Sequence, residues 1–107
     1  MINYEDFSKV ELKVGKILEV TDHPNADKLY VLKVDVGEGV VTQMVAGVKN
    51  YYKPEELVGK LGAVVTNLEP KPLRGVDSNG MVLAANSGEN LAILTIDKEI
   101  APGTKIK

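Results

Sequence analysis

The segment that organises this 107-residue chain is residues 67–81, NLEPKPLRGVDSNGM. Pro70 and Pro72 exclude a helix interior and a central strand, because each proline lacks an N–H and fixes its own φ. Gly75 and the pair Asn79-Gly80 tolerate positive φ. We therefore expect a long, stiffened loop between two apolar runs, and long loops in compact domains tend to carry function.

Outward from this segment, apolar and polar residues alternate in the way that is typical of half-buried strands. In the first strand Leu18 belongs to the apolar series and Ile17 to the other face, with a bend or bulge at Gly15-Lys16. In the second strand Tyr30 falls on the core face and Lys33 on the exposed face. The expected strands are residues 10–20, 29–36, 40–46, 61–67, 81–85 and 91–96, with a hairpin turn at 37–39 and a last extended piece near residue 106.

Helical patterns in the sequence are short. Residues 3–8 predict one turn capped by Asn3, and residues 54–57 predict another with proline at its first position. Phe7, the only phenylalanine, is expected to plug one end of the core. Short strands, glycines at bends and single-turn helices predict an all-β fold, a five-stranded Greek-key barrel. The whole chain, 1–107, is then one domain, with a barrel core over about 9–86 and extensions at 1–8 and 87–107.

Composition limits the function classes. With 44% hydrophobic and 26% charged residues the chain has the balance of a soluble globular protein, and no apolar run approaches the roughly 18 residues of a membrane span. The absence of cysteine, and acidic first residues without an apolar secretory core, favour a reducing cytoplasm. A net charge of −2 excludes a globally basic nucleic-acid binder, so any such binding requires a local basic patch.

Catalysis is not expected. His23, the only histidine, precedes a proline in a turn and has no evident serine or cysteine partner, which favours a turn-stabilising role. One histidine and no cysteine argue against a metal site, and no glycine-rich phosphate-binding motif is present. We predict a protein that is not an enzyme and that uses no cofactor and no metal.

Binding explains the polar residues better. Arg74, the only arginine, lies close in sequence to Lys71 and Ser78, and a planar fork of donors beside a hydroxyl suits a phosphate or a carboxylate. Lys28 opens the second strand and Lys33 projects from its exposed face. A solvated surface loop with incidental charges is the alternative. Because few aromatic residues are available for stacking, recognition of folded RNA by shape is favoured over base-by-base reading.

A set of motifs runs through almost the whole chain in order: VGKI at 14–17, HPNADKL at 23–29, VDVG at 34–37, VAG at 45–47, NLEP at 67–70, LRGVDSNGM at 73–81 and LAA at 83–85. This set resembles the tRNA-binding OB-fold domain. That domain is appended to methionyl-tRNA synthetases and to bacterial phenylalanyl-tRNA synthetase β chains, and also occurs in tRNA-synthetase cofactor cytokines and as free-standing tRNA-binding proteins. The opening DFSKV and the closing DKEIAPG most resemble the C-terminal domain of methionyl-tRNA synthetase, which dimerises.

The resemblance implies an OB-fold barrel that binds tRNA by shape, near the outer corner of the L, with little sequence preference. Turn-holding roles for Asn25 and Ser78 and a core-plug role for Met81 stay open. Gln43 and Ala46 stand where many relatives have an arginine and a serine, which predicts weaker and less salt-sensitive binding. Carried over to matching positions, the implied RNA-contacting residues are Asn25, Lys33, Arg74, Ser78 and Met81, with Lys28 and Lys71 as phosphate neighbours.

Further partners and alternatives follow from the same sequence. The resemblance implies a methionyl-tRNA synthetase catalytic chain as a partner. One alternative is a secretion-chaperone-like relative that binds unfolded peptides in an apolar groove, and another is a domain that only holds a synthetase dimer together. A homodimer is predicted from apolar residues in the two terminal extensions, namely Ile2, Phe7, Ile96, Ile100 and Ile106.

Overall fold

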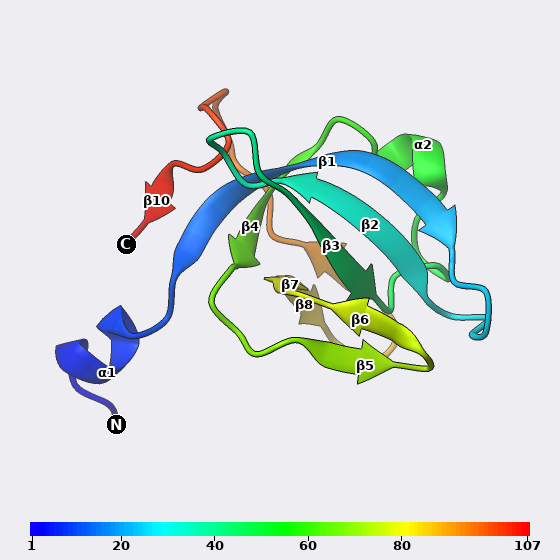
Figure 1. Ribbon diagram of the computed structural model, residues 1–107, viewed down its shortest axis with the longest axis horizontal. Coiled ribbons are helices and arrows are strands. Elements are labelled where there is room, and N and C mark those ends of the chain that lie inside the picture. Colours follow the sequence, from blue (N-terminus) through cyan, green and yellow to red (C-terminus); the bar gives the residue numbers. More distant parts are fainter.

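β1 (Leu12–Asp22) is the longest strand and lies at the centre of the main sheet. β2 (Tyr30–Asp35) and β3 (Val41–Ala46) follow it as an antiparallel meander, and β4 (Leu61–Val65) pairs with the other side of β1. β7 (Met81–Val82) pairs with β4, so the strand order is β3-β2-β1-β4-β7 (Figure 1).

The main sheet closes nearly into a barrel in the computed structural model, which describes residues 1–107. Residues just before β7 bridge to the far edge of the sheet. The Asn79 N–H donates to the Gln43 carbonyl at 2.8 Å. The Val45 N–H donates to the Ser78 hydroxyl at 3.0 Å. The expected all-β, five-stranded OB-fold barrel is confirmed.

The expected register of β1 is wrong at Ile17 and Leu18, whereas Val20 packs against the core as expected. Pairing with β2 slips between Ile17 and Glu19 rather than at Gly15-Lys16, and Ile17 is 1% exposed whereas Leu18 is 39% exposed. An irregularity of this kind moves the following side chains to the opposite face of the strand. Gly15 is required for another reason, because a Cβ there would lie 2.7 Å from Cγ1 of Val34.

The core is filled mainly by aliphatic side chains from the barrel strands, from α2 (Pro54–Leu57) and from β9 (Leu91–Ile93). α2 begins with its proline, as expected, and Leu57 is completely buried. Full burial of a large apolar side chain contributes roughly 1.5–3 kcal/mol. Tyr30 faces the core as expected. The buried cluster consists of Ile17, Tyr30, Leu32, Val34, Val36, Met44, Val48, Leu57, Val64 and Ile93.

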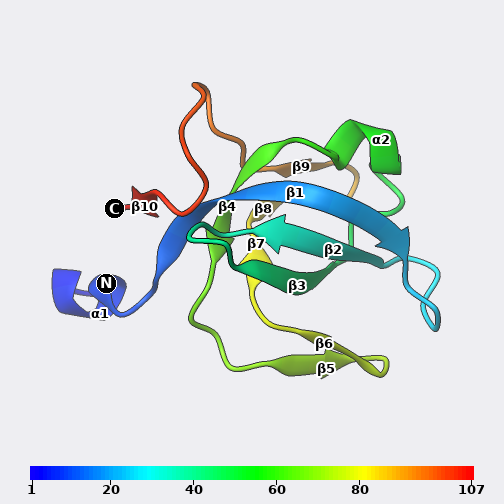
Figure 2. The same ribbon diagram turned by 45° about the horizontal axis from the view of Figure 1, so that its top comes forward.

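α1 (Tyr4–Ser8) is a single turn that lies outside the barrel. Its expected N-cap is confirmed, because the side-chain oxygen of Asn3 accepts the Asp6 N–H at 2.9 Å. The expectation that Phe7 plugs the core is wrong, since no residue of α1 is buried and Phe7 is 39% exposed. β10 (Lys105–Ile106) pairs with the start of β1, and both termini lie at the same end of the molecule (Figures 1 and 2).

Residues 67–81 differ from the continuous loop that their prolines predict. β5 (Lys71–Leu73) and β6 (Val76–Ser78) pair as an antiparallel hairpin, which forms a small sheet of its own beside β3 (Figure 2). Pro72 faces Asp77, one pair beyond the pair that closes the turn. The alternation of an antiparallel ladder requires no N–H at that position, so proline is compatible with this strand.

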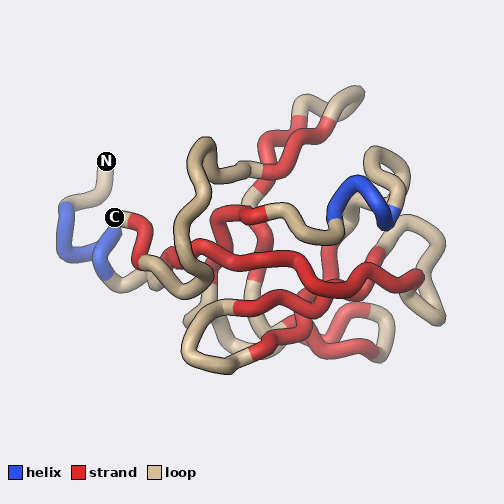
Figure 3. The backbone as a smooth tube through the Cα atoms, turned by 90° about the horizontal axis from the view of Figure 1, so that it is seen from above, coloured by secondary structure: helices blue, strands red, loops and turns tan.

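The last third of the chain is also more broken than the sequence predicts. In place of continuous strands over 81–85 and 91–96, β7 ends at Val82 and a second small sheet pairs β8 (Ala84–Asn86) with β9. Figure 3 shows that helix is confined to α1 and α2, among short strands and loops. Neither helix has the length and apolar character needed to cross a membrane.

Candidate nucleic-acid interface

The β5–β6 hairpin turns at Arg74 and Gly75, whose φ angles are +53° and +90°. A two-residue turn with positive φ at both positions matches the twist of the strands that it joins. Glycine adopts this conformation freely, whereas a residue with a side chain does so at a cost of about 1–2 kcal/mol. The only arginine of the chain is therefore held in a backbone conformation that is typical of functional positions.

The loop between β1 and β2 holds this turn through three hydrogen bonds. Nε2 of His23 donates to the Leu73 carbonyl at 2.8 Å. The Asn25 side chain donates to the Arg74 carbonyl at 3.1 Å, and the Arg74 guanidinium donates to the Asn25 carbonyl at 3.3 Å. We call these four residues the clasp. It brings together the HPNADKL and LRG motifs, whose bonded residues are 49 or 50 positions apart in the sequence.

The four cations that the sequence predicts as RNA contacts form no ion pair with a carboxylate. The ion pairs of the structure are formed by Lys9, Lys13 and Lys49, with Asp6, Glu11 and Asp22 respectively. A guanidinium has five N–H donors, and one from Arg74 is used within the protein. The cations that remain free of ion pairs include all four that the sequence predicts, Lys28, Lys33, Lys71 and Arg74.

Gln43, on β3, joins the hairpin to the sheet and also contacts Lys33 on β2. The Lys33 ammonium donates to the side-chain oxygen of Gln43 at 2.7 Å, and the Gln43 amide donates to the Asp77 carbonyl at 2.9 Å. Glu19 lies opposite Lys33 on β1. The family motif marks Gln43 only as a position where an arginine is missing. No local sequence pattern reveals its bridging role, because that role depends on the contact between β3 and β6.

Ser78 and Met81 lie beside a groove beneath the hairpin. Ser78 is 6% exposed, and its hydroxyl accepts the Val45 N–H and donates to the Gly80 carbonyl at 2.9 Å, so it holds a turn. Met81 is 45% exposed rather than a core plug. The groove has a volume of about 540 Å³ and is lined by Val45, Leu68, Glu69, Lys71, Leu73, Ser78, Gly80 and Met81.

The pair Asn79-Gly80 does not use the positive φ that the sequence suggests. Gly80 is required because a Cβ there would lie 2.7 Å from the Val65 carbonyl oxygen and 2.8 Å from Cε of Met44. The close approach brings β4, β3 and the base of the hairpin together. This reason for a glycine is visible only after the barrel has closed.

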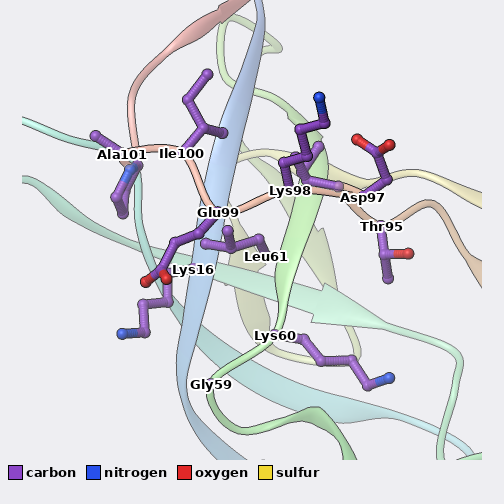
Figure 4. A pocket seen from close by; sticks show the side chains of 12 residues that line it. Lys16, Gly59, Lys60, Leu61, Thr95, Asp97, Lys98, Glu99, Ile100 and Ala101 are labelled. Carbon is purple, nitrogen blue, oxygen red and sulfur yellow. The ribbon is translucent and has the colours of Figure 1, made fainter.

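A second cavity, of about 640 Å³, lies between β1, the start of β4 and residues 95–102 (Figure 4). Its three lysines, Lys16, Lys60 and Lys98, are accompanied by Asp97 and Glu99. Figure 4 shows the Glu99 carboxylate directed to the same side as Lys16. The mixed charge makes this cavity a poorer anion site than the clasp. No group of three or more histidine, cysteine or carboxylate side chains is arranged to hold a metal.

The chain is similar in sequence to segments of known methionine--tRNA ligases. The chain is 60% identical over 106 residues to the methionine--tRNA ligase of Pyrococcus horikoshii, covering 99% of this chain and 14% of that protein. It is 51% identical over 105 residues to the methionine--tRNA ligase of Thermotoga maritima, covering 98% of this chain and 16% of that protein. The chain therefore spans about a seventh of the curated relatives that it matches.

Two solved structures are similar over the whole chain. The CsaA chaperone protein from Picrophilus torridus has a TM-score of 0.92 and 38% identity, covering 100% of both chains. The MetRS related protein from Pyrococcus horikoshii has a TM-score of 0.92 and 30% identity, covering 100% of this chain and 98% of that one. The model of the family described as "Putative tRNA binding domain" matches residues 12–105. This match confirms the resemblance seen in the motifs, and the chain belongs to the tRNA-binding domain family.

Proposed function

We propose that this domain binds tRNA by the shape of its sugar–phosphate backbone, as a non-catalytic affinity module of, or for, a methionyl-tRNA synthetase in the cytoplasm. The clasp is the observation that carries the proposal, because it fixes the only arginine, with four unused N–H donors, at an exposed turn. Identity of 60% to a stretch of a methionine--tRNA ligase supports the link to that enzyme.

The charges support phosphate as the ligand. The chain carries a net charge of −2, so attraction to RNA must come from cations within about a Debye length of the contact. Lys28 and Arg74 lie on the two elements that form the clasp, Lys71 lies on the same hairpin, and Lys33 is bridged to the hairpin through Gln43. Each is free of an ion pair with a carboxylate. The proposed contact set is completed by Asn25 and Met81, with Ser78 as the buried support of the hairpin base.

The aromatic residues support recognition by shape rather than by stacking. Tyr30 is buried and donates to the Tyr52 carbonyl, while the Tyr52 hydroxyl accepts the Ile93 N–H. Tyr51 is 38% exposed, but its hydroxyl contacts the Gly88 carbonyl at 3.4 Å, away from the clasp. Reading of single-stranded bases needs aromatic platforms, and none stands beside Arg74. A folded RNA backbone fits the available donors better.

The proposal is tested by titrating the protein with tRNA, with a minihelix and with an unstructured oligomer of equal length, at about 50 and about 200 mM salt. Four phosphate contacts predict a loss of affinity of roughly a hundredfold between these salt concentrations. Arg74→Ala should weaken tRNA binding by roughly 1–3 kcal/mol, as loss of a charge-assisted contact does. Lys60→Ala removes the same charge in the second cavity and is the matched control. Equal affinity for the unstructured oligomer would refute recognition by shape.

A second candidate function is the binding of unfolded peptides. Two observations favour it: the groove beneath the hairpin exposes Leu68 and Met81, and one of the similar structures is named as a CsaA chaperone protein. Peptide binding in this groove should be insensitive to salt and should be abolished by Met81→Asp. Under the first proposal, the same titration with peptides shows no saturable binding.

We also propose that the domain forms a homodimer through its N-terminal extension. Ile2 is 71% exposed, Tyr4 76% and Phe7 39%, and no residue of α1 is buried. Apolar side chains gathered at one end of a domain are typical of an interface. A dimer would present two clasps and raise the avidity for one tRNA molecule.

A further inference from the structure

His23 is a buried titratable side chain that the proposed contact set does not use. It is 5% exposed, and both of its ring nitrogens have backbone partners. Nδ1 lies 2.9 Å from the Asn25 nitrogen and Nε2 lies 2.8 Å from the Leu73 oxygen. A backbone N–H can only donate and a carbonyl can only accept, so Nδ1 is the acceptor and Nε2 carries the proton. The ring therefore joins the β1–β2 loop to the end of β5 and has no capacity left for a reacting group or a phosphate.

The clasp secures the peptide groups on both sides of the Arg74 Cα. The Leu73 carbonyl, before it, accepts from His23, and the Arg74 carbonyl, after it, accepts from the Asn25 side chain. Fixing these two peptides fixes the direction of the Cα–Cβ bond between them. The positive φ of Arg74 makes this restraint necessary, because other backbone conformations are preferred for a residue with a side chain.

The rest of the hairpin does not supply this restraint. β5 and β6 form a sheet of their own, and the bridges from β6 to the barrel lie at its end, at Asp77, Ser78 and Asn79. Beyond these bridges, the hydrogen bonds that hold the turn are those of the clasp. Without His23, the turn would remain joined to the β1–β2 loop through Asn25 alone.

We propose that His23 is a positioning residue for RNA binding, which aims the Arg74 guanidinium by tying the Leu73 carbonyl to the β1–β2 loop. This inference rests on the proposed function, since it concerns how Arg74 reaches a phosphate. A group that must be held in place binds more tightly when its geometry is fixed in advance. His23 itself touches no RNA.

Two substitutions separate the two hydrogen bonds of the ring. In His23→Asn the side-chain oxygen still accepts the Asn25 N–H, as in an Asx-turn, but the side chain is too short to reach Leu73. In His23→Gln the longer amide reaches the Leu73 carbonyl and gives up the bond to Asn25. The proposal predicts that His23→Asn lowers tRNA affinity about tenfold and reduces the slope of log K against log salt by up to about one, as loss of one phosphate contact does. His23→Gln should retain most of the wild-type tRNA affinity and most of the wild-type salt slope.

A double-mutant cycle with Arg74→Ala gives the decisive comparison. If His23 acts through the arginine, His23→Asn lowers affinity in the wild-type chain and changes it little in the Arg74→Ala chain. Equal losses in both chains would overturn the proposal, because they would indicate a general loss of structure. An unchanged affinity of His23→Asn, beside a clear loss in Arg74→Ala, would overturn it as well and leave the proposed function intact. An unchanged affinity of Arg74→Ala would instead refute the proposed function.

Folding is checked by circular dichroism and thermal melting of each variant. If His23→Asn is unfolded at the assay temperature, the cycle is run with Asn25→Ala, which removes the side-chain bond to the Arg74 carbonyl at an exposed position. Non-additivity with Arg74→Ala supports positioning, and additive losses contradict it, since a direct contact of Asn25 with RNA would add. NMR order parameters of the Arg74 side chain in the free protein should fall in the clasp variants and stay unchanged in Lys60→Ala.

Discussion

The ammonium of Lys33 lies 2.7 Å from the side-chain oxygen of Gln43, on directly opposed residues of β2 and β3. Gln43 is bonded in turn to the Asp77 carbonyl on β6. Asp77 is three residues from Arg74, or about 10 Å along an extended strand. The two cations therefore stand beside the two points at which the hairpin is attached to the barrel, and this places them within reach of one RNA backbone.

Gln43→Arg should convert the neutral bridge into an additional phosphate contact. We expect tRNA affinity at low salt to rise about tenfold, and the slope of log K against log salt to steepen by about 0.9. Titrations at several salt concentrations measure both quantities. Val58→Arg adds the same charge at an exposed position after α2, and should leave the slope unchanged. An unchanged slope in Gln43→Arg would show that this position does not face RNA.

Arg74→Gly should separate stability from binding. Glycine relieves the positive φ but adds chain entropy to the unfolded state, so we expect the free energy of unfolding to stay unchanged or to rise by up to about 1 kcal/mol. Affinity for tRNA should nevertheless fall. Glu38, with a φ of +54°, offers a matched control on the β2–β3 turn. Glu38→Gly should change the free energy of unfolding in the same way without lowering tRNA affinity. A loss of tRNA affinity in Glu38→Gly would indicate that glycine at a turn is itself sufficient to weaken binding.

Gly80→Ala should destabilise the domain by about 1–3 kcal/mol, as overpacking of a filled core does. The new Cβ would meet the Val65 carbonyl oxygen at 2.7 Å, and a backbone atom cannot move aside as a flexible side chain can. Gly47→Ala is the control, because its Cβ would meet nothing closer than Cδ2 of Leu29 at 3.7 Å and its φ is not positive. Urea unfolding of both variants should give a change within about 0.5 kcal/mol for Gly47→Ala. Similar values for the two would contradict the close approach at Gly80.

Acid should weaken one contact between the residue that precedes β1 and the residue that follows β4, Glu11 and Thr66. The Thr66 hydroxyl, which donates to the Glu11 carboxylate, and the Lys13 ammonium hold the pKa of Glu11 below its ordinary value of 4.5. A carboxyl with a lowered pKa in the folded state stabilises the fold above about pH 4.5, and this stabilisation is lost as the pH falls through the folded pKa. The free energy lost in Thr66→Val should therefore be larger at about pH 7 than at about pH 2.5. Thr95→Val, at an exposed threonine, should show no such dependence.

Light scattering should report a mass about twice 11.6 kDa if the N-terminal extension forms a dimer. Phe7→Asp should then shift the protein to the monomer, because an unpaired charge in an apolar interface is costly. Val40→Asp introduces the same charge at a residue that is 52% exposed on the β2–β3 turn, and should leave the mass unchanged. A monomer at micromolar concentration in the unsubstituted protein would refute the dimer.

The sequence predicts the parts of this fold that depend on local pattern. Alternation of apolar and polar residues locates β1 to β3, an apolar run locates β4, and Asn3 and Pro54 mark the starts of the two helical turns. These features follow from backbone geometry within a few residues. Alternation fails at Leu18, because a register shift inside a strand leaves no compositional mark and reverses which face each following residue occupies.

Residues 67–81 show why the candidate site was harder to predict than the barrel. Two prolines indicate a loop, yet Pro72 falls on the one kind of strand position that needs no N–H, and the strand forms. The motifs indicate which residues matter but not how they meet. His23 and Leu73 touch only because the barrel closes, and Ser78 is polar in sequence but buried in its turn.

The separation of the clasp's two halves has a consequence for biosynthesis. A chain that has emerged from the ribosome only as far as β3 contains His23 and Asn25 but not the carbonyls that they hold. The proposed RNA-binding site therefore forms late in folding, after the long-range contacts of β6 and β7 have been made. Incomplete or unfolded chains should not bind tRNA. Because tRNA then binds only the folded domain, it should raise the melting temperature of that domain.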